Sequence, residues 1–404
     1  MKKNLRALPS HKERQALLAE RRNAKMAKSA HAYVRGSTLR FYAWLETANG
    51  LAVPEGPAVW ICGDCHVGNL GPIANTKGKI DIHIRDLDQT VIGNPAHDLI
   101  RLGLSLASAA RSSDLAGVTT AKILEQMIDG YETAIADLAN VSSEEIVKPD
   151  LVKHALKDAL NRKWKHLAKE RIEDTTPTIP LGNRFWPLTK EENRCIKTLF
   201  AEEKVRKLVT SLRSRDDDAQ IEVRDAAFWV KGCSSLGLLR YAVLLTVGEG
   251  TSDLCLIDIK EAVKPAAPHY PRVKMPRNNG NRVVQGACNL SPALGNRMLA
   301  AELAQRSVFM RELLPQDLTL ELVHWTQEEA VKTARYLAVV IGKAHARQME
   351  PAARKSWLRD LHRHHSKTLD APSWLWSSVT ELLVSHEGGY LEHCRKYALS
   401  AGGE

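Results

Sequence analysis

The chain has 404 residues, enough for two or three domains. It has a formal net charge of +10, and its 44% hydrophobic and 26% charged residues are typical of globular proteins. No apolar run approaches the roughly 20 residues that a transmembrane helix requires. The charged opening segment lacks the apolar core of a signal peptide. Seven scattered cysteines favour a reducing compartment over a disulfide framework. We therefore expect a cytoplasmic protein without a membrane span.

The first half of the chain shows mostly helical periodicity, with two strands set within it. Two helices are expected over 9–48, interrupted near Gly36, and another begins at Pro95. The remaining predicted elements of this half are strands at 57–62 and 79–86, helices at 119–138, 143–173 and 190–213, and a Pro-, Thr- and Gly-rich loop at 174–189.

The second half changes character near residue 219, where the pattern becomes that of antiparallel strands, over 220–262. The elements predicted after them are a loop at 264–282, a short helix at 283–289, a hairpin at 297–314, a helix at 326–349 and helical structure to about residue 398. We divide the chain into an N-terminal part of a helical lobe (1–215), a strand-rich lobe (216–320) and C-terminal helices that complete the helical lobe (321–404).

Acidic and amide side chains follow the two strands of the first half. Asp64 and Asn69 come after the first strand, and Asp86 and Asp88 end the second. Mg²⁺ is usually held by one or two carboxylates together with substrate phosphates. In phosphoryl transfer one Asp orients the attacking hydroxyl, while an Asn and a later Asp hold metal. The order predicts Asp64 as the orienting group, although Asp and Asn also cap ordinary turns. Asn69, Asp86 and Asp88 are the predicted metal ligands.

The same loop also fits a different pattern. Cys62, Cys65 and His66 match C-x-x-C-H, which is the attachment sequence for haem. Covalent haem attachment normally requires export, and the opening segment does not resemble an export signal. A redox dithiol is a further alternative, but the expected βαβ context is missing from the sequence. We therefore favour the metal and phosphate interpretation of this loop.

A glycine-rich loop and a strand lysine predict a site for nucleotide phosphates. The sequence KGCSSLG joins two predicted strands and offers Gly232, Gly237, two hydroxyls and free backbone N–H groups. The hydroxyls belong to Ser234 and Ser235. Lys260 follows on the strand I-D-I-K, as a lysine that contacts phosphates does in kinases. Kinases pair this lysine with a helical Glu. No convincing Glu is found here, since the next helix carries Gln285 and Glu261 points to the opposite strand face. Glu302 on the later hairpin stays open as a candidate.

The basic segment at the start of the chain and a group of histidines near its end are both interpreted as solvent-exposed surfaces. The first 28 residues contain nine Lys or Arg and two Glu, and such faces also bind nucleic acid or steer anionic substrates. No zinc-finger spacing or stacking pattern accompanies this charge, so nucleic acid stays an alternative partner. His362, His364 and His365 could bind metal, but no carboxylate accompanies them in the sequence.

The segment GDCHVGN…IRDLDQTVIGNPAHDL resembles the catalytic core of the aminoglycoside and choline phosphotransferases, in the protein-kinase-like superfamily. Cys62 stands where those proteins have a leading His, and Asn94 replaces an Asp. The resemblance implies ATP and Mg²⁺ as cofactors, Asp64 and His66 as catalytic residues, and phosphoryl transfer to a hydroxyl. It places Asp98 at a helix start, where it would anchor the catalytic loop.

More of the chain resembles an uncharacterised bacterial family of unknown function, DUF2252. The shared motifs include Tyr-x-Arg-Gly, GDxHxxNxG, DxDxT, SSLGLxRY, Lys-Glu-Ala, Arg-Val-Val-x-Gly and Ala-His-Ala-Arg, spread from about residue 26 to 348. The chain departs from the family's Asp-Phe-Asp-Glu, because Leu87 and Gln89 occupy two of those places.

The motif order is unusual for a kinase, because Asp64 precedes Lys260. We therefore expect an α+β, two-lobed, protein-kinase-like fold with a circular permutation, which is tolerated when domain termini lie close together. The predicted function is ATP- and Mg²⁺-dependent phosphoryl transfer to an unidentified acceptor. The alternatives are a nucleotide-binding pseudoenzyme, an AMP transferase and a basic nucleic-acid-binding protein.

Overall fold

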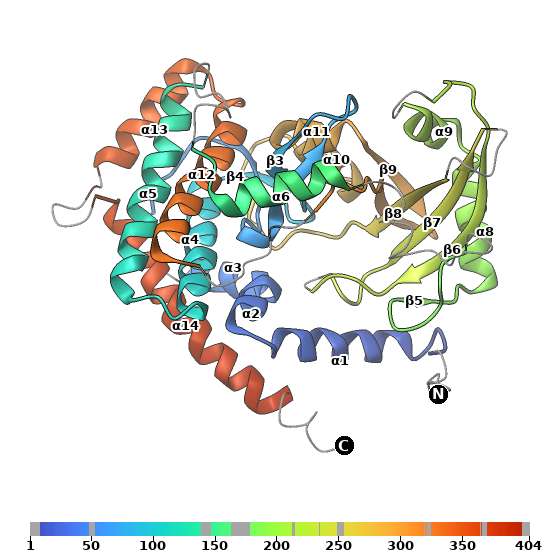
Figure 1. Cartoon of the computed structure of the whole chain (residues 1–404), viewed down its shortest axis with the longest axis horizontal. Helices are drawn as coiled ribbons and strands as arrows, with labels where there is room; N and C mark the ends of the chain where they lie inside the picture. The colour runs from blue at the N-terminus through green and yellow to red at the C-terminus, as the bar shows by residue number, and fades with distance from the viewer. Residues whose placement is uncertain are drawn as a thin grey trace.

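The computed structural model describes residues 9–47, 53–138, 147–162, 178–211, 215–233, 235–248, 254–318, 320, 325–363, 365 and 370–397. It shows an α+β protein in which an antiparallel sheet stands beside a group of helices (Figure 1). Among the helices that these residues form, none combines the length and the apolar character needed to cross a membrane.

The helices are α1 (Arg14–Met26), α2 (Ala30–Gly36), α3 (Thr38–Thr47), α4 (Pro95–Ser112), α5 (Gly117–Ala136), α6 (Asp150–Asn161), α8 (Lys190–Phe200), α9 (Glu203–Thr210), α10 (Asn279–Leu290), α11 (Pro292–Gly295), α12 (Gln327–Ala346), α13 (Pro351–Arg363) and α14 (Ser373–Tyr397). The strands are β1 (Val59–Ile61), β2 (Leu70–Ala74), β3 (Ile80–Ile84), β4 (Val91–Gly93), β5 (Phe185–Trp186), β6 (Ile221–Trp229), β7 (Arg240–Val247), β8 (Leu254–Glu261), β9 (Met298–Leu303) and β10 (Arg306–Glu312). A short 3-10 turn spans Val67–Asn69.

The main sheet has six strands in the order β5-β6-β7-β8-β10-β9, and every neighbouring pair is antiparallel. Because side chains alternate across a strand, each strand sends one set of residues to each face. One face packs with α8 and α9 in an apolar cluster that includes Val243, Ile257 and Met310. Lys260 lies opposite Arg240 on β7 and Phe309 on β10. The register therefore centres Lys260 within the sheet.

The boundary of the sheet side differs from the sequence-based division. Residues 190–210, expected to belong to the helical lobe, form α8 and α9 and pack on the sheet (Figure 1). The sheet side therefore begins before residue 216. Helix α1 joins the two sides: Arg14 binds Glu192 of α8 at 2.8 Å, and near its other end the Asn23 carbonyl lies 2.8 Å from His393 of α14.

The helical side is built around α4, α5, α12 and α14, which share one large apolar cluster. Helix α4 begins as expected at Pro95, because the Asn94 side chain accepts a hydrogen bond from the Ala96 N–H at 3.0 Å. Helices α5 and α12 approach closely at two glycines. A Cβ on Gly130 would lie 2.4 Å from the Arg335 carbonyl oxygen, and one on Gly342 would lie 2.7 Å from the Ala134 Cβ.

This close approach predicts opposite effects for two Gly→Ala substitutions. Gly130→Ala should destabilise the protein by ~1–3 kcal/mol, because the new methyl group meets a backbone atom that cannot move away. Gly388→Ala in α14 meets nothing within 4 Å and should stabilise by up to ~1 kcal/mol through helix propensity. Urea unfolding of both variants measures the difference. Equal effects of the two substitutions would contradict the predicted helix contact.

Several elements differ in detail from the expectation. The expected two helices of 9–48 are three over the described residues 9–47, because Ser37 separates α2 from α3. Strands β2 and β4 were not predicted, and β5 lies within the expected loop 174–189. Of the expected helix 143–173, the structure describes α6, while 139–146 and 163–177 lie outside the described residues. Helix α10 begins four residues earlier than expected, because the Asn278 side chain caps the Asn281 N–H.

Candidate functional site

Asp86 and Asp88 lie in a turn that directly follows β3, called the acidic turn below. The β2–β3 hairpin positions this turn. Leu70 pairs with Ile84, and the Arg85 N–H donates to the Asn69 carbonyl at 2.8 Å. Asn69 therefore lies directly across from Arg85, the residue before Asp86. The sequence predicted that Asp86 and Asp88 end the strand. The strand ends earlier, at Ile84, so both residues lie in the turn that follows it.

Lys260 of the main sheet reaches this turn. Its Nζ lies 3.1 Å from Asp86 Oδ1 and 3.4 Å from both carboxylate oxygens of Asp88. The Lys260 side chain is only 9% exposed, whereas those of Asp86 and Asp88 are 40% and 21% exposed. Two segments 174 residues apart in sequence thus meet around one ammonium group. The lysine partner that sequence analysis could not find is this pair of carboxylates, and Glu302 is exposed on the edge strand β9.

The two carboxylates differ in their ionisation. Burial raises the pKa of Asp88 to about 7, and the negative charge of Asp86 adds to that effect. Burial also opposes ionisation of Asp86, but the Lys260 ammonium and hydrogen bonds to Asp88 and Lys260 outweigh it and lower the Asp86 pKa. With both carboxylates ionised, one ammonium leaves an uncompensated negative charge. This partly exposed group can therefore accept a further cation.

The loop that carries Asp64 is fixed by Asp98 at the start of α4. Asp98 Oδ2 accepts from the Cys62 N–H at 2.7 Å, and Oδ1 accepts from the Gly63 N–H at 3.0 Å. The structure thus confirms the anchoring role expected for Asp98. His345 of α12, in the Ala-His-Ala-Arg motif, lies 3.3 Å from Asp98 Oδ2. The Tyr131 hydroxyl lies 3.0 Å from the other ring nitrogen of His345.

Asp64 is itself buried and ion-paired. Arg101 Nε donates to Asp64 Oδ1 at 3.0 Å, and an Arg101 Nη donates to the Val34 carbonyl of the Tyr-x-Arg-Gly motif at 2.6 Å. Burial raises the pKa of Asp64, although Arg101 opposes this shift. His66 Nε2 lies 3.8 Å from Asp64 Oδ2. Burial, with the charges of Arg35 and Arg101, lowers the pKa of His66 well below its usual value, so this ring is neutral near pH 7.

Asn69 holds the loop together from inside. Its side-chain Nδ2 donates to the Asp64 carbonyl at 2.9 Å, and its backbone N–H donates to the His66 carbonyl at 2.8 Å. The side chain is buried beside the turn. The amide nitrogen therefore has a structural hydrogen bond, while the amide oxygen is the atom with the chemistry of a Mg²⁺ ligand.

The glycine-rich loop joins β6 to β7 as expected. Gly232 and Gly237 have φ values of +111° and +112°, a backbone region that favours glycine. Lys25 Nζ of α1 donates to the Gly232 carbonyl at 2.7 Å. A Cβ on Gly232 would lie 2.3 Å from the Ser235 Oγ, so the loop is tightly folded. Ser234 lies outside the described residues.

A large cleft adjoins this loop, with a volume of about 1730 Å³. Its walls include Trp229 and Leu236 on the sheet side, and Leu313 and Leu314 after β10. Eight Lys or Arg residues line it against four Asp or Glu, which favours an anionic ligand. The cations are Arg21, Lys25, Lys28, Arg85, Arg162, Arg184, Lys231 and Arg311. Of the predicted site residues only Gly232 lines the cleft itself, while Asp86 directly follows Arg85.

The basic N-terminal segment is therefore more than a solvated face. Three of its cations, Arg21, Lys25 and Lys28, line the cleft. Arg14 is buried against Glu192, which also accepts a hydrogen bond from the Tyr241 hydroxyl at 3.0 Å. Helix α1 runs between the sheet side and α14 (Figure 1), and part of it lines the cleft.

Two contacts of α10 were not foreseen from the sequence. Arg282 donates to the carbonyls of Thr90, Asp88 and Val263, the last two at 3.0 and 2.9 Å. A Cβ on Gly286 would lie 2.4 Å from the Thr90 Cγ2. The Arg-Val-Val-x-Gly and Asp-x-Asp-x-Thr motifs therefore pack directly on each other. Helix α10 thereby holds the backbone of the acidic turn in place through Arg282 and Gly286.

The two cysteines of the C-x-x-C-H pattern are free and buried. A hydrogen bond with Cys65 lowers the pKa of Cys62, but burial and the Asp98 charge outweigh it and leave that pKa raised. The same hydrogen bond, together with burial, raises the pKa of Cys65 well above its usual value. Both groups are thiols near pH 7, and reactive dithiols require a thiolate.

The family model described as "Uncharacterized protein conserved in bacteria (DUF2252)" matches residues 14–396. Comparisons with curated proteins and with solved structures find no match. The matched range extends from the start of α1 into the last turn of α14 and includes the acidic turn, the glycine-rich loop and Lys260. The family resemblance noted in the sequence is thus confirmed, and the chain belongs to the bacterial family DUF2252.

Proposed function

We propose that this protein is a kinase-like phosphotransferase, which uses ATP and Mg²⁺ to phosphorylate a hydroxyl of an acceptor. One observation carries the proposal: the sheet lysine Lys260 meets the carboxylates of Asp86 and Asp88 at 3.1 and 3.4 Å. A buried lysine beside metal-binding carboxylates is the arrangement that phosphoryl transfer uses to hold triphosphate and metal together. The adjoining cationic cleft supports the same conclusion.

The order of elements on the sheet side supports a kinase-like arrangement. A strand, a glycine-rich loop, a second strand, a lysine-bearing strand and a helix occur in β6, 232–237, β7, β8 and α10. Kinases use this order to cover the phosphates and to place the lysine. Because the acidic loops precede these elements in the chain, the proposed fold is a circularly permuted, two-lobed version. Asp86 and Asp88 take the place of a helical Glu beside Lys260.

The residues present fit a Mg²⁺ ion bound with a nucleotide. Asp86 and Asp88 provide partly exposed carboxylates. Asn69 offers an amide oxygen from the segment whose backbone binds Arg85, the residue before Asp86. Mg²⁺ would neutralise charge that develops on the phosphates. Lys260 pairs with these carboxylates in the structure, and with an ion held there its ammonium would be available to the phosphates. Trp229, Leu313 and Leu314 give the apolar part of the cleft that a base requires.

A second candidate, nucleotide binding without phosphoryl transfer, is favoured by the environment of Asp64. Its carboxylate is buried and held by Arg101 at 3.0 Å, so one oxygen is already engaged. In the first proposal Asp64 orients the acceptor hydroxyl with its other oxygen. In the second, Asp64 only ties α4 to the loop. Turnover therefore separates these two functions, whereas nucleotide binding does not.

The test is thermal unfolding of the full chain with ATP, with and without Mg²⁺, followed by analysis of products from labelled ATP. We expect Mg²⁺-ATP to raise the melting temperature, since a ligand at about 100 times its Kd contributes ~2.7 kcal/mol. Asp86→Asn should abolish that shift, and Asp81→Asn serves as the matched control, because Asp81 lies on β3 before the turn. Release of ADP supports phosphoryl transfer, and release of pyrophosphate indicates AMP transfer instead. Binding without either product supports the second candidate. No thermal shift with Mg²⁺-ATP would overturn both.

A further inference from the structure

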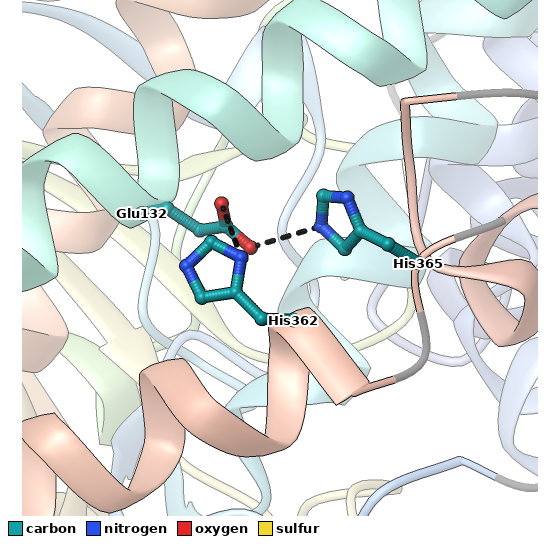
Figure 2. A group of neighbouring side chains, drawn as sticks. All are labelled: Glu132, His362 and His365. Atoms are coloured by element: carbon teal, nitrogen blue, oxygen red, sulfur yellow. Dashed lines mark hydrogen bonds and ion pairs between the residues drawn. The ribbon is translucent and has the colours of Figure 1, made fainter. Parts of the chain in front are cut away.

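A histidine and carboxylate cluster lies on the helical side, away from the cleft. Glu132 comes from α5, His362 from the last turn of α13, and His365 from the segment that follows α13 (Figure 2). In the sequence no carboxylate accompanies these histidines, which favoured a solvated surface. The fold supplies one from more than 200 residues upstream, since His365 and Glu132 are 233 positions apart.

The three ligand atoms are arranged at distances suited to one metal ion. His365 Nε2 lies 3.3 Å from Glu132 Oε1, and His362 Nδ1 lies 3.8 Å from Glu132 Oε2. One ligand atom from each residue falls within 4.8 Å of the others. A tetrahedral Zn²⁺ with bonds of about 2.0–2.1 Å separates its ligand atoms by roughly 3.4 Å. The two contacts to Glu132, at 3.3 and 3.8 Å, are close to that separation, and the 4.8 Å limit for the whole set exceeds it by about 1.4 Å.

The surroundings of His365 provide a second, independent observation. Its Nδ1 lies 3.2 Å from Asp370 Oδ1, on the side of the ring opposite to Glu132. Histidine ligands of metals characteristically donate their other ring N–H to a carboxylate, which fixes the tautomer and the ring orientation. Asp370 would thus orient His365 with Nε2 free for the metal. The Glu132 side chain is only 12% exposed, whereas His362 is 60% exposed and leaves an approach from solvent.

We propose that Glu132, His362 and His365 form a binding site for Zn²⁺ or a similar divalent transition metal. Two imidazoles and one carboxylate favour such ions over Mg²⁺ and Ca²⁺, which prefer oxygen ligands. Three protein ligands leave one tetrahedral position for water. The site fastens the end of α13 to α5. On these same helices, Trp357 of α13 donates to the Tyr131 hydroxyl of α5 at 3.1 Å. Tyr131 in turn contacts His345, so the metal would stabilise the helix pair that holds this histidine.

The test uses the full-length chain without an affinity tag, stripped of metal with EDTA and titrated with Zn²⁺. We expect about one tight site per chain, and we expect Zn²⁺ to raise the melting temperature. Glu132→Gln, His362→Ala and His365→Ala should each weaken binding by at least ~10-fold and remove the thermal shift. His269→Ala is the matched control, because His269 is an exposed histidine on the loop after β8.

A gain of spectroscopic signal guards against variants that merely misfold. Co²⁺ should give visible absorption in the wild type, and His362→Cys should keep binding while adding the charge-transfer band of a thiolate ligand. Absence of saturable Zn²⁺ binding would overturn the proposal. Equal affinity in the three cluster variants and the wild type, or equal loss in His269→Ala, would overturn it as well. None of these readouts depends on ATP turnover, so the result stands apart from the proposed phosphotransferase.

Discussion

Lys260→Met should lower the turnover of ATP by roughly 100- to 1000-fold, which is the usual cost of removing one preorganised charged group from a transition state. The lysine is the only one of the predicted cofactor residues whose described contacts join the sheet to the acidic turn, through Asp86 and Asp88. Without its ammonium the triphosphate loses a point charge that no uncharged side chain of similar length replaces. Steady-state kinetics on the purified variant measure kcat and KM for ATP.

The matched control for this prediction is Lys264→Met, four residues further along the chain and exposed. It removes the same charge from the protein and should leave turnover unchanged. Lys260→Met also leaves two carboxylates facing each other, so its fold must be checked by circular dichroism. A double variant with Asp88→Asn relieves that repulsion and shows whether lost activity comes from lost stability. Turnover in Lys260→Met equal to that in Lys264→Met would rule out the proposed role of Lys260.

The acidic turn and the loop before it show which parts of the candidate site could be predicted from the sequence. Spacing and residue type pointed to Asp64, Asn69 and Asp86 as neighbours, because each follows a strand and a short loop. The structure brings them into one region through the β2–β3 hairpin. Strand β2 itself was not predicted, since the sequence Leu-Gly-Pro-Ile-Ala contains the two residues that most weaken a strand pattern. The order of the elements was therefore easier to predict than their boundaries.

The partners of buried charges could not be predicted, because they lie far away in the sequence. Arg101 sits on a helix with the apolar spacing of a core element, yet its guanidinium is buried against Asp64. His345 stood out in the sequence only as part of the Ala-His-Ala-Arg motif, and it contacts Asp98, 247 positions earlier. Periodicity tells which face of a helix is buried, but it does not tell what that face meets. The carboxylate beside His362 and His365 was missed for the same reason.

The missing helical Glu is the most informative difference from the kinase pattern. In the arrangement we propose, α10 takes the place of that helix, and it carries Arg282, whose guanidinium donates to backbone carbonyls of the acidic turn and of Val263. An arginine there cannot pair with Lys260, so the counter-charge has to come from elsewhere. Asp86 and Asp88 provide it. Lys260 is therefore in direct contact with the acidic turn. A cation bound at that turn would change the position of the Lys260 ammonium.

Asp98→Ala should destabilise the protein by ~3–5 kcal/mol, because it removes a buried carboxylate that accepts several hydrogen bonds. Two backbone N–H groups, those of Cys62 and Gly63, would lose their acceptor at 2.7 and 3.0 Å, and His345 would lose its carboxylate neighbour. Each buried donor left without a partner costs about 1–3 kcal/mol. Urea unfolding, with the slope checked for two-state behaviour, measures the change.

The matched control is Asp129→Ala on α5, because Asp129 pairs with Arg335 at 2.7 Å with a side chain that is 52% exposed. Such an exposed pair contributes at most ~1 kcal/mol. A double-mutant cycle of Asp98→Ala with His345→Ala should show a coupling of about 0.5–3 kcal/mol, as expected for residues of one network. A loss below 1 kcal/mol for Asp98→Ala would show that the loop holds its shape without this carboxylate. Because the same loop presents Asp64, a destabilised but folded Asp98→Asn variant should also lose turnover through kcat, with the KM for ATP little changed.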